Sequence, residues 1–310
     1  MNPARPSTAA VWVSALRPKT LGASLCPVLM GGALAYHDGA LKDTLQWQLV
    51  GSAFAGACLL QIASNFANDL FDGLRGTDSG ERLGPARAVG CKLVTPRAMV
   101  FALCITLVFA GFPAWFLAHH SGVVFAIIGV CGAIAAVGYT APPFTLAYRG
   151  LGDLFVFVFF GPIAVAGTRA ACDGAWTISA LVCGFAPGAI AVCLLATNNL
   201  RDRVGDLSND KRTLVARFGQ RFGRTQIIVC HVLACIVPMF AVIMLQLPPT
   251  IMLASFIAFM FAPASITIAR GRDGVALNKN LAMFGALLYV YGATFALAIW
   301  TGQSMSGGAK

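Results

Sequence analysis

Long apolar runs, separated by short polar loops, recur along the whole chain. A helix needs about 20 mainly apolar residues to cross the hydrocarbon core of a bilayer. Runs of roughly that length occur nine times. They lie at residues 20–36, 47–67, 98–118, 121–139, 151–168, 176–198, 226–246, 250–269 and 281–302. The pattern therefore predicts an all-α polytopic membrane protein with nine transmembrane helices.

The composition agrees with a membrane protein. Of the 310 residues, 58% are hydrophobic and only 11% are charged, whereas about a quarter are charged in an ordinary soluble domain. The cysteines form no C-x-x-C pair and mostly fall inside the apolar runs, so we interpret them as small buried residues. We expect one integral-membrane domain over residues 1–310.

The basic residues of the loops predict the orientation, because Lys and Arg collect on the cytoplasmic side of a membrane protein. With the N-terminus inside, 19 of the 22 basic residues lie on the cytoplasmic side, and the other three are Lys42, Arg169 and Lys310. The N-terminus and the acidic loops are therefore expected to be cytoplasmic. This topology explains the net charge of +10, which is thus no evidence for nucleic-acid binding.

The acidic residues are concentrated in two short stretches, one after the second apolar run and one after the sixth. Loops are where charges are solvated, and a single acidic loop would need no further explanation. Two loops with matched architecture favour a functional interpretation. Seven of the twelve acidic residues lie there: Asp69, Asp72, Asp78, Glu81, Asp202, Asp206 and Asp210.

Both stretches have their polar residues at helical spacing. If each helix continues through its stretch, five pairs lie one turn apart. They are Asn65 and Asp69, Asn68 and Asp72, Asn198 and Asp202, Asp202 and Asp206, and Asp206 and Asp210. Aligned like charges cost a few tenths of a kcal/mol per pair. A bound cation would compensate for this cost.

The separation of the two stretches indicates a weak internal repeat. Asp69 and Asp202 are 133 residues apart, about the length of four membrane helices. Helices 1–4 and 5–8 would then be equivalent units, as in other membrane folds built from duplicated halves. The two acidic stretches would face each other across a central cavity.

The residue types at the two stretches suit Mg²⁺ and phosphate. Mg²⁺ prefers oxygen ligands, often one or two carboxylates completed by water and phosphate oxygens. Basic residues able to contact phosphate flank both stretches. They are Arg75, Arg82 and Lys92 at the first stretch, and Arg201, Lys211, Arg212 and Arg217 at the second. At a membrane surface, this combination predicts a lipid diphosphate as substrate.

Two other classes of membrane protein share parts of this pattern. Asp69-x-x-Asp72-Gly73 also opens the signature of the CDP-alcohol phosphotransferases, but the further Gly and two Asp of that signature are missing. An ion-coupled transporter remains a remote alternative. Its ionisable groups would lie near the bilayer midplane, whereas the clusters here lie at helix ends.

The chain resembles the UbiA superfamily of intramembrane aromatic prenyltransferases. Its two motifs are matched by "NDLFD" at 68–72 and "DRVGD" at 202–206. Within the superfamily the sequence is most similar to the branch that prenylates 1,4-dihydroxy-2-naphthoate in menaquinone synthesis, and the Gly76 and Asp78 spacing is typical of that branch. Asp210, where the branch usually has Gly, and Arg169 depart from its pattern.

The resemblance implies nine helices around a central cavity and a Mg²⁺-dependent reaction in a bacterial cytoplasmic membrane. A polyprenyl group would pass from polyprenyl diphosphate to 1,4-dihydroxy-2-naphthoate, with loss of diphosphate and CO₂, giving demethylmenaquinone. Other aromatic acceptors, 4-hydroxybenzoate or homogentisate, remain alternatives. The partners would be these two substrates and the lipid bilayer, with no nucleic acid.

The resemblance also assigns roles to individual residues. Asn68, Asp69 and Asp72 would hold one Mg²⁺, and Asn199, Asp202 and Asp206 another, with Asp210 as a further candidate. Asp72, Asp202 and Tyr139 are the expected catalytic residues, and Lys19, Arg82, Lys92, Lys211 and Arg212 the expected substrate-binding residues.

Three assignments have structural alternatives. Tyr139 either stabilises an allylic cation through its ring or is an interfacial tyrosine. Lys19 either reaches the carboxylate of the acceptor or anchors its helix. We interpret the aromatic run at residues 155–162 as a packing or lipid-facing surface rather than a prenyl tunnel.

Overall fold

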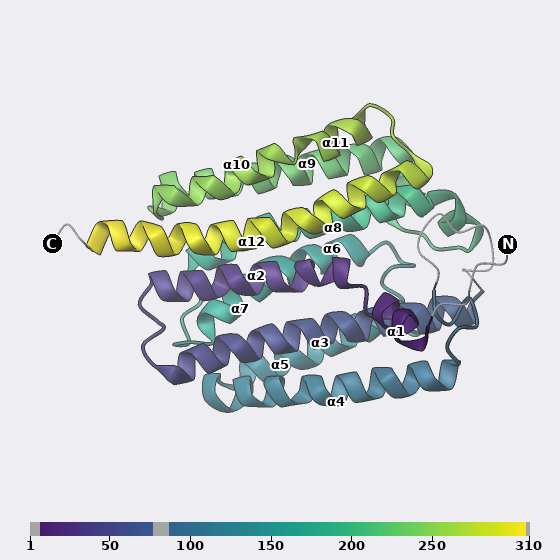
Figure 1. The fold of residues 1–310 in the computed structure, drawn as a ribbon, viewed down its shortest axis with the longest axis horizontal. Coiled ribbons are helices and arrows are strands. Elements are labelled where there is room, and N and C mark those ends of the chain that lie inside the picture. Colours follow the sequence, from purple (N-terminus) through teal and green to yellow (C-terminus); the bar gives the residue numbers. More distant parts are fainter. Residues whose placement is uncertain (1–6, 77–86, 308–310) are drawn as a thin grey trace.

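The computed structural model describes residues 7–76 and 87–307, and every regular element in these ranges is a helix (Figure 1). The long helices run side by side in alternating directions. The elements are α1 Thr8–Leu16, α2 Pro18–His37, α3 Thr44–Leu74, α4 Pro96–Ser121, α5 Val123–Gly138, α6 Gly152–Val158, η1 Phe159–Ile163, α7 Ala164–Ala170, α8 Ile178–Ser208, α9 Leu214–Leu245, η2 Pro249–Ile251, α10 Met252–Met260, α11 Ala262–Ala269, η3 Gly274–Ala276 and α12 Leu277–Gly307.

These elements form nine membrane-length segments in the described part of the chain, which confirms the predicted all-α fold. Two segments are composite: α6, η1 and α7 run on as one, and so do η2, α10 and α11. Seven of the nine are long and apolar enough to cross a membrane by length and composition. The shorter apolar helix α5 and the 20-residue α2 complete the set.

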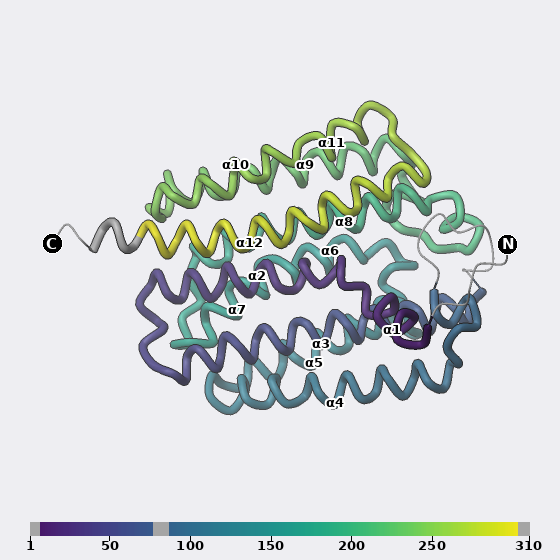
Figure 2. The backbone as a smooth tube through the Cα atoms, viewed as in Figure 1, coloured from purple at the N-terminus to yellow at the C-terminus, as the bar shows by residue number. Residues whose placement is uncertain are grey.

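The alternating directions sort the loops into two groups at opposite ends of the bundle. The backbone trace shows the loops before α4, α6, α9 and α12 at the same end as α1 (Figure 2). The loops before α3, α8 and α10 lie at the other end, together with the end of α12. Among the described residues, the end that carries α1 holds most of the loop arginines and lysines, together with Asp69, Asp72, Asp202 and Asp206.

A helix break shapes the interior. Pro162 has no N–H to donate, and the chain around it forms a π-helical turn with Gly161 at φ −127° and ψ −111°. The backbone then approaches α8 closely. A Cβ on Gly161 would lie 2.6 Å from the carbonyl oxygen of Gly184, and one on Gly188 would lie 2.5 Å from that of Phe157. Small residues at this crossing therefore let two backbones touch.

Some helix ends differ from those that the apolar runs predict. Helices α3 and α8 continue beyond their runs to Leu74 and Ser208, as the spacing of the polar residues suggested. Helix α9 begins at Leu214 rather than near residue 226, where the Thr213 hydroxyl accepts from the N–H of Ala216 and caps it. The chain is kinked at Gly219, with φ 85° and ψ 179°, before the long apolar part of the helix. The short helix α1 was not predicted. The internal repeat stays a prediction.

A buried arginine joins three segments at the end of the bundle away from α1. Arg169, at the end of α7, is 4% exposed. Its guanidinium contacts Asp38 at 2.7 Å and Asp173 at 2.5 Å. Burial raises the pKa of Asp38, but hydrogen bonds from His37 and Arg169 outweigh it, so the pKa is lowered overall. The arginine that departs from the family pattern therefore clamps α2 and α7 to the loop before α8.

Candidate active site

A large cavity runs through the middle of the bundle, with a volume of about 1540 Å³. Residues of α2, α3, α5, α6, α7 and α8 form its walls, with contributions from α1, α4 and α12. Its polar end lies at the acidic stretches, where Asn68, Asp72 and Asn199 line it. Its far end is lined by residues such as Trp115 and Phe125. The cavity thus combines a charged head with an apolar interior.

Asp69 and Asp72 of the first acidic stretch lie on the last turns of α3, and Asp78 and Glu81 lie outside the described residues. Both oxygens of the buried Asp69 accept backbone N–H bonds, from Ala88 at 3.0 Å and from Val89 at 2.9 Å. Asp69 therefore holds the loop after residue 86 against the helix. Arg87, 18 residues later in the chain, is thereby brought close to Asp69. It lines the polar end of the cavity.

Asp72 is surrounded by donors from other segments. Arg87 forms a buried ion pair with it and also donates to the carbonyl oxygen of Asn68 at 2.6 Å. The hydroxyl of Tyr148 donates to Asp72 at 2.8 Å. Burial is the main cause that raises the pKa of Tyr148 to about 12, and the negative charge of Asp72 is the second. The phenol therefore stays protonated and remains a donor to the carboxylate.

Asp202 and Asp206 of the second acidic stretch lie on the last turns of α8, where Arg201 binds Asp202. The guanidinium binds both oxygens of Asp202 at 2.6 and 2.7 Å. It also donates to Asn198 at 2.8 Å and to Asn278 of α12 at 2.7 Å. This buried fork ties α8 to α12 and fixes the carboxylate of Asp202, which is itself not part of the cavity lining.

Lys211 connects the two stretches. Its ammonium nitrogen lies 3.6 Å from Asp206 and 5.7 Å from the centre of the Tyr148 ring, and Tyr148 in turn binds Asp72. Asn68, Asp69 and Asp72 line the same cavity as Asn199 and Lys211. Asn199 and Lys211 thus bring the second stretch to the cavity that Asn68, Asp69 and Asp72 line, whereas Asp202, Asp206 and Asp210 are not part of the lining.

The oxygen donors at this end suit a hard divalent cation. Asp206 is buried, and among the described residues its Oδ2 has no hydrogen-bond partner. Asn199, also buried, lines the cavity. The described residues hold no group of three His, Cys, Asp or Glu side chains close enough to enclose a metal by themselves. Such an open donor set fits Mg²⁺, which completes its shell with water and phosphate oxygens.

The structure brings only some of the predicted substrate-binding residues to the cavity. Lys19 and Lys211 line it, as does Tyr139. Lys92 and Arg212 are exposed and are not part of the lining. Arg82 lies outside the described residues.

Asp210 does not continue the acidic face of α8. The helix ends at Ser208, and Asp210 has a left-handed backbone with φ 51°. Its side chain is 80% exposed and pairs with Arg212 at 2.8 Å. The expected one-turn alignment of Asp206 with Asp210 is therefore wrong, because the chain leaves the helix before that position. The metal role suggested for Asp210 gains no support.

Three residues that sequence reasoning did not single out belong to the site. Arg87 was counted among the loop cations, but nothing in its spacing pointed to Asp72. Tyr148 and Asn278 reach the site from other loops and helices. The aromatic run after residue 154 also faces inward in part. Phe155, Phe159 and Phe160 line the cavity, so its interpretation as only a packing or lipid-facing surface is wrong.

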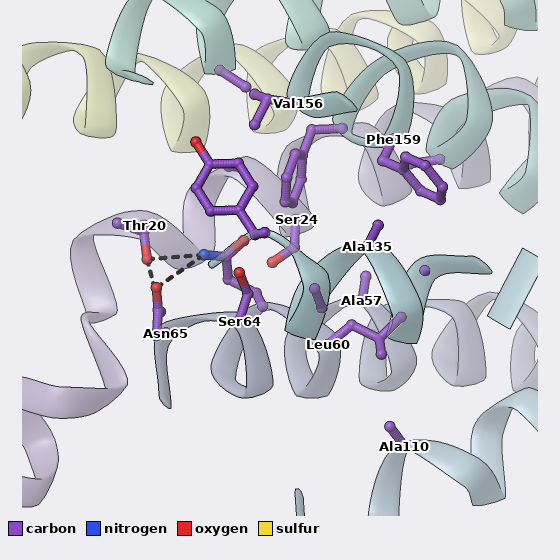
Figure 3. Close-up of a pocket in the computed structure, with 18 of the residues that line it drawn as sticks. Thr20, Ser24, Ala57, Leu60, Ser64, Asn65, Ala110, Ala135, Val156 and Phe159 are labelled. Carbon is purple, nitrogen blue, oxygen red and sulfur yellow. Dashed lines mark hydrogen bonds between the residues drawn. The ribbon is translucent and has the colours of Figure 1, made fainter. Parts of the chain in front are cut away.

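The middle of the cavity contains a small polar recess within apolar walls. Figure 3 shows Thr20 and Ser24 of α2 opposite Ser64 and Asn65 of α3. The apolar side chains drawn around the recess are Ala57, Leu60, Ala110, Ala135, Val156 and Phe159.

Fold and site together define an all-helical integral membrane protein with a charged cavity head and an apolar interior. The chain belongs to the UbiA prenyltransferase family, whose model matches residues 24–302. It is 35% identical to 1,4-dihydroxy-2-naphthoate octaprenyltransferase of Mycobacterium tuberculosis, over 95% of this chain and 98% of that protein. It is 37% identical to the Escherichia coli protein of the same name, over 67% of this chain and 68% of that protein.

Solved structures agree on the fold. A UbiA homolog from Aeropyrum pernix K1 matches with a TM-score of 0.68 and 14% identity, covering 90% of this chain and 97% of that chain. A UbiA homolog from Archaeoglobus fulgidus, bound to DMAPP and Mg²⁺, matches with a TM-score of 0.59 and 14% identity, covering 92% and 99%. The protein is thus a membrane-embedded prenyltransferase with the UbiA fold.

Proposed function

We propose that this protein transfers a polyprenyl group from polyprenyl diphosphate to 1,4-dihydroxy-2-naphthoate. Diphosphate and CO₂ are released and demethylmenaquinone is formed. The cavity is the main support for this proposal, because the end lined by carboxylates and cations is continuous with a large apolar interior. An amphiphilic substrate with a charged head and a hydrocarbon tail matches this division. The names of the relatives at 35–37% identity support the naphthoate acceptor.

The residues at the cavity head suit the departure of diphosphate. Lys211 and Arg87 line this end and place positive charge where negative charge develops on the leaving group. Asn68, Asp69 and Asp72 on one side and Asn199, Asp202 and Asp206 on the other are the proposed holders of Mg²⁺. When bound, Mg²⁺ supplies further positive charge toward the diphosphate oxygens.

Tyr139 is the proposed partner of the allylic carbon. It lines the cavity beside the charged head. Burial, together with the charges of Asp153, Asp206 and Asp72, raises its pKa, so the phenol remains neutral. Its ring then offers an uncharged π face that attracts positive charge on the allylic group without trapping it covalently. The apolar interior excludes water, which would otherwise compete with the aromatic ring for the cation.

The proposed location is a bacterial cytoplasmic membrane, with the charged head of the cavity on the cytoplasmic side. The end of the bundle that holds the acidic stretches also holds most of the loop arginines and lysines. Basic loops stay on the cytoplasmic side during insertion. In this orientation, a diphosphate head group in the cytoplasmic leaflet reaches the site directly.

An acceptor assay tests the proposed function. Purified protein in liposomes receives Mg²⁺, one polyprenyl diphosphate and, in separate reactions, 1,4-dihydroxy-2-naphthoate, 4-hydroxybenzoate or homogentisate. We expect a prenylated and decarboxylated product from the naphthoate alone, and no product after chelation of Mg²⁺ with EDTA. Product from 4-hydroxybenzoate alone would contradict the proposal.

A further inference from the structure

The polar recess in the middle of the cavity is formed by residues other than the proposed holders of Mg²⁺ and diphosphate. Its residues come from facing turns of α2 and α3. They are Thr20, Ser24, Gln61, Ser64 and Asn65. Gln61 precedes Asn68 by seven residues on the same helix, which places it about 10 Å deeper in the cavity. A molecule bound at this recess would therefore lie next to the reacting end of a lipid diphosphate.

Two backbone carbonyls determine how the recess is oriented. The side-chain nitrogen of Asn65 donates to the carbonyl oxygen of Leu16 at 2.9 Å and to the hydroxyl oxygen of Thr20 at 3.1 Å. A carbonyl only accepts, so the amide nitrogen of Asn65 must face it. The Thr20 hydroxyl donates its own hydrogen to the carbonyl oxygen of Arg17 at 2.9 Å. Thr20 therefore has only lone pairs left to offer.

These constraints orient the amide of Gln61. Its nitrogen donates to the hydroxyl oxygen of Thr20 at 3.3 Å and to the side-chain oxygen of Asn65 at 3.4 Å. Both neighbours only accept, so turning the amide over would place oxygen against oxygen. Its Oε1 consequently points away from both neighbours, and it receives no hydrogen bond from the described residues. The recess thus presents an acceptor oxygen in a fixed direction.

The surroundings of this oxygen select the kind of ligand. Leu60, Val156 and Phe159 line the same part of the cavity (Figure 3). Gln61 is half-buried and lines the cavity, so its Oε1 is open to a molecule bound there. A flat apolar ring that carries a hydroxyl group would fill the apolar space and supply the missing donor.

We propose that Oε1 of Gln61 accepts a hydrogen bond from a ring hydroxyl of the aromatic acceptor and so makes the enzyme selective for hydroxylated rings. This inference rests on the proposed function. As the ring attacks the allylic carbon, its hydroxyl oxygen takes on positive charge and donates more strongly, so the bond strengthens along the reaction. The proton stays on the hydroxyl, because an amide oxygen is too weak a base to remove it.

Binding measurements on naphthoates with and without a hydroxyl test the proposal. Titration calorimetry with purified protein compares 1-hydroxy-2-naphthoate and 4-hydroxy-2-naphthoate with 2-naphthoate, for the wild type and for Gln61→Met. We expect the wild type to bind one hydroxylated ring about tenfold more tightly than 2-naphthoate, as one hydrogen bond allows. Gln61→Met removes the acceptor at similar size, so it should abolish this preference and leave 2-naphthoate binding unchanged.

Two controls separate recognition from structural damage. Gln48→Met makes the same change at an exposed position of the same helix outside the cavity lining, and should keep the wild-type preference. Thr20→Val leaves Gln61 in place but removes the hydroxyl that orients it, so the preference should fall, whereas Thr20→Ser should restore it. This pair keeps the proposal testable if Gln61→Met does not fold.

The outcomes distinguish the inference from the proposed function. The role of Gln61 alone would be overturned if the wild type prenylates the naphthoate but Gln61→Met keeps the preference for the hydroxylated ring. The same holds if Gln61→Met weakens the binding of all three naphthoates equally. A wild type that neither binds nor prenylates any naphthoate would overturn the proposed function, and the role of Gln61 with it.

Discussion

The buried ion pair between Arg87 and Asp72 offers a quantitative test of how the cavity head is built. The two side chains are 9% and 3% exposed. Arg87→Met leaves the Asp72 carboxylate buried with the Tyr148 hydroxyl as a remaining donor. Breaking one side of a buried pair costs about 3–5 kcal/mol, and the remaining donor favours the lower value of about 3 kcal/mol. With an unfolding entropy of about 2 cal/mol/K per residue over 310 residues, Tm should fall by about 5 °C.

Thermal unfolding in detergent, followed by circular dichroism, measures this change. The double variant Arg87→Met/Asp72→Asn removes the unpaired charge and keeps an acceptor for Tyr148, so it should recover most of the lost Tm. Prenyl transfer should remain abolished in both variants, because both residues contribute to the cavity head. Arg97→Met, at an exposed arginine outside the cavity lining, is the matched control and should melt like the wild type. If the Tm of the double variant is lower than that of Arg87→Met, the unpaired Asp72 charge is not the cause of the lost stability.

Three further predictions concern other parts of the molecule. Tyr139→Phe keeps the π face and should retain kcat within about twofold, whereas Tyr139→Leu should lower kcat about tenfold in the prenyl-transfer assay. Gly188→Ala places a Cβ 2.5 Å from a carbonyl oxygen of α6 and should cost about 1–3 kcal/mol, while Gly205→Ala, with open space around it, should leave Tm unchanged; equal Tm values would contradict the close crossing. The lowered pKa of Asp38 stabilises the fold above about pH 4 and loses this effect as the pH falls further. Arg169→Met should therefore flatten the dependence of Tm on pH between about 6 and 3, and an unchanged slope would exclude the clamp.

The architecture could be predicted because each part of it depends on local pattern. A membrane-crossing segment must satisfy its own backbone hydrogen bonds, so a long apolar run in this setting becomes a helix. The continuation of α3 and α8 through their acidic stretches was also predicted, from the spacing of asparagines and aspartates. The start of α9 was misplaced because its first turns are polar, and hydropathy does not report a helix that extends beyond an apolar run.

The residues of the cavity head were predicted only in part. Asn68, Asp72, Asn199 and Lys211 do line the cavity, since they share helix faces or follow them directly. Asp210 does not share the helix face of Asp206, because the chain turns into a left-handed conformation just after α8. The position of a helix end depends on capping and on neighbouring segments, and spacing alone does not determine it.

Local pattern alone thus determined the nine membrane-length segments and the two acidic stretches. Tertiary packing decided the partners of these groups: Arg87 for Asp72, Lys211 between the two stretches, and Gln61 held by Thr20 and Asn65. These contacts join residues from different helices and loops. Which donor meets which acceptor depends on how the helices cross and where the loops fold back, and no periodicity in the chain records that arrangement.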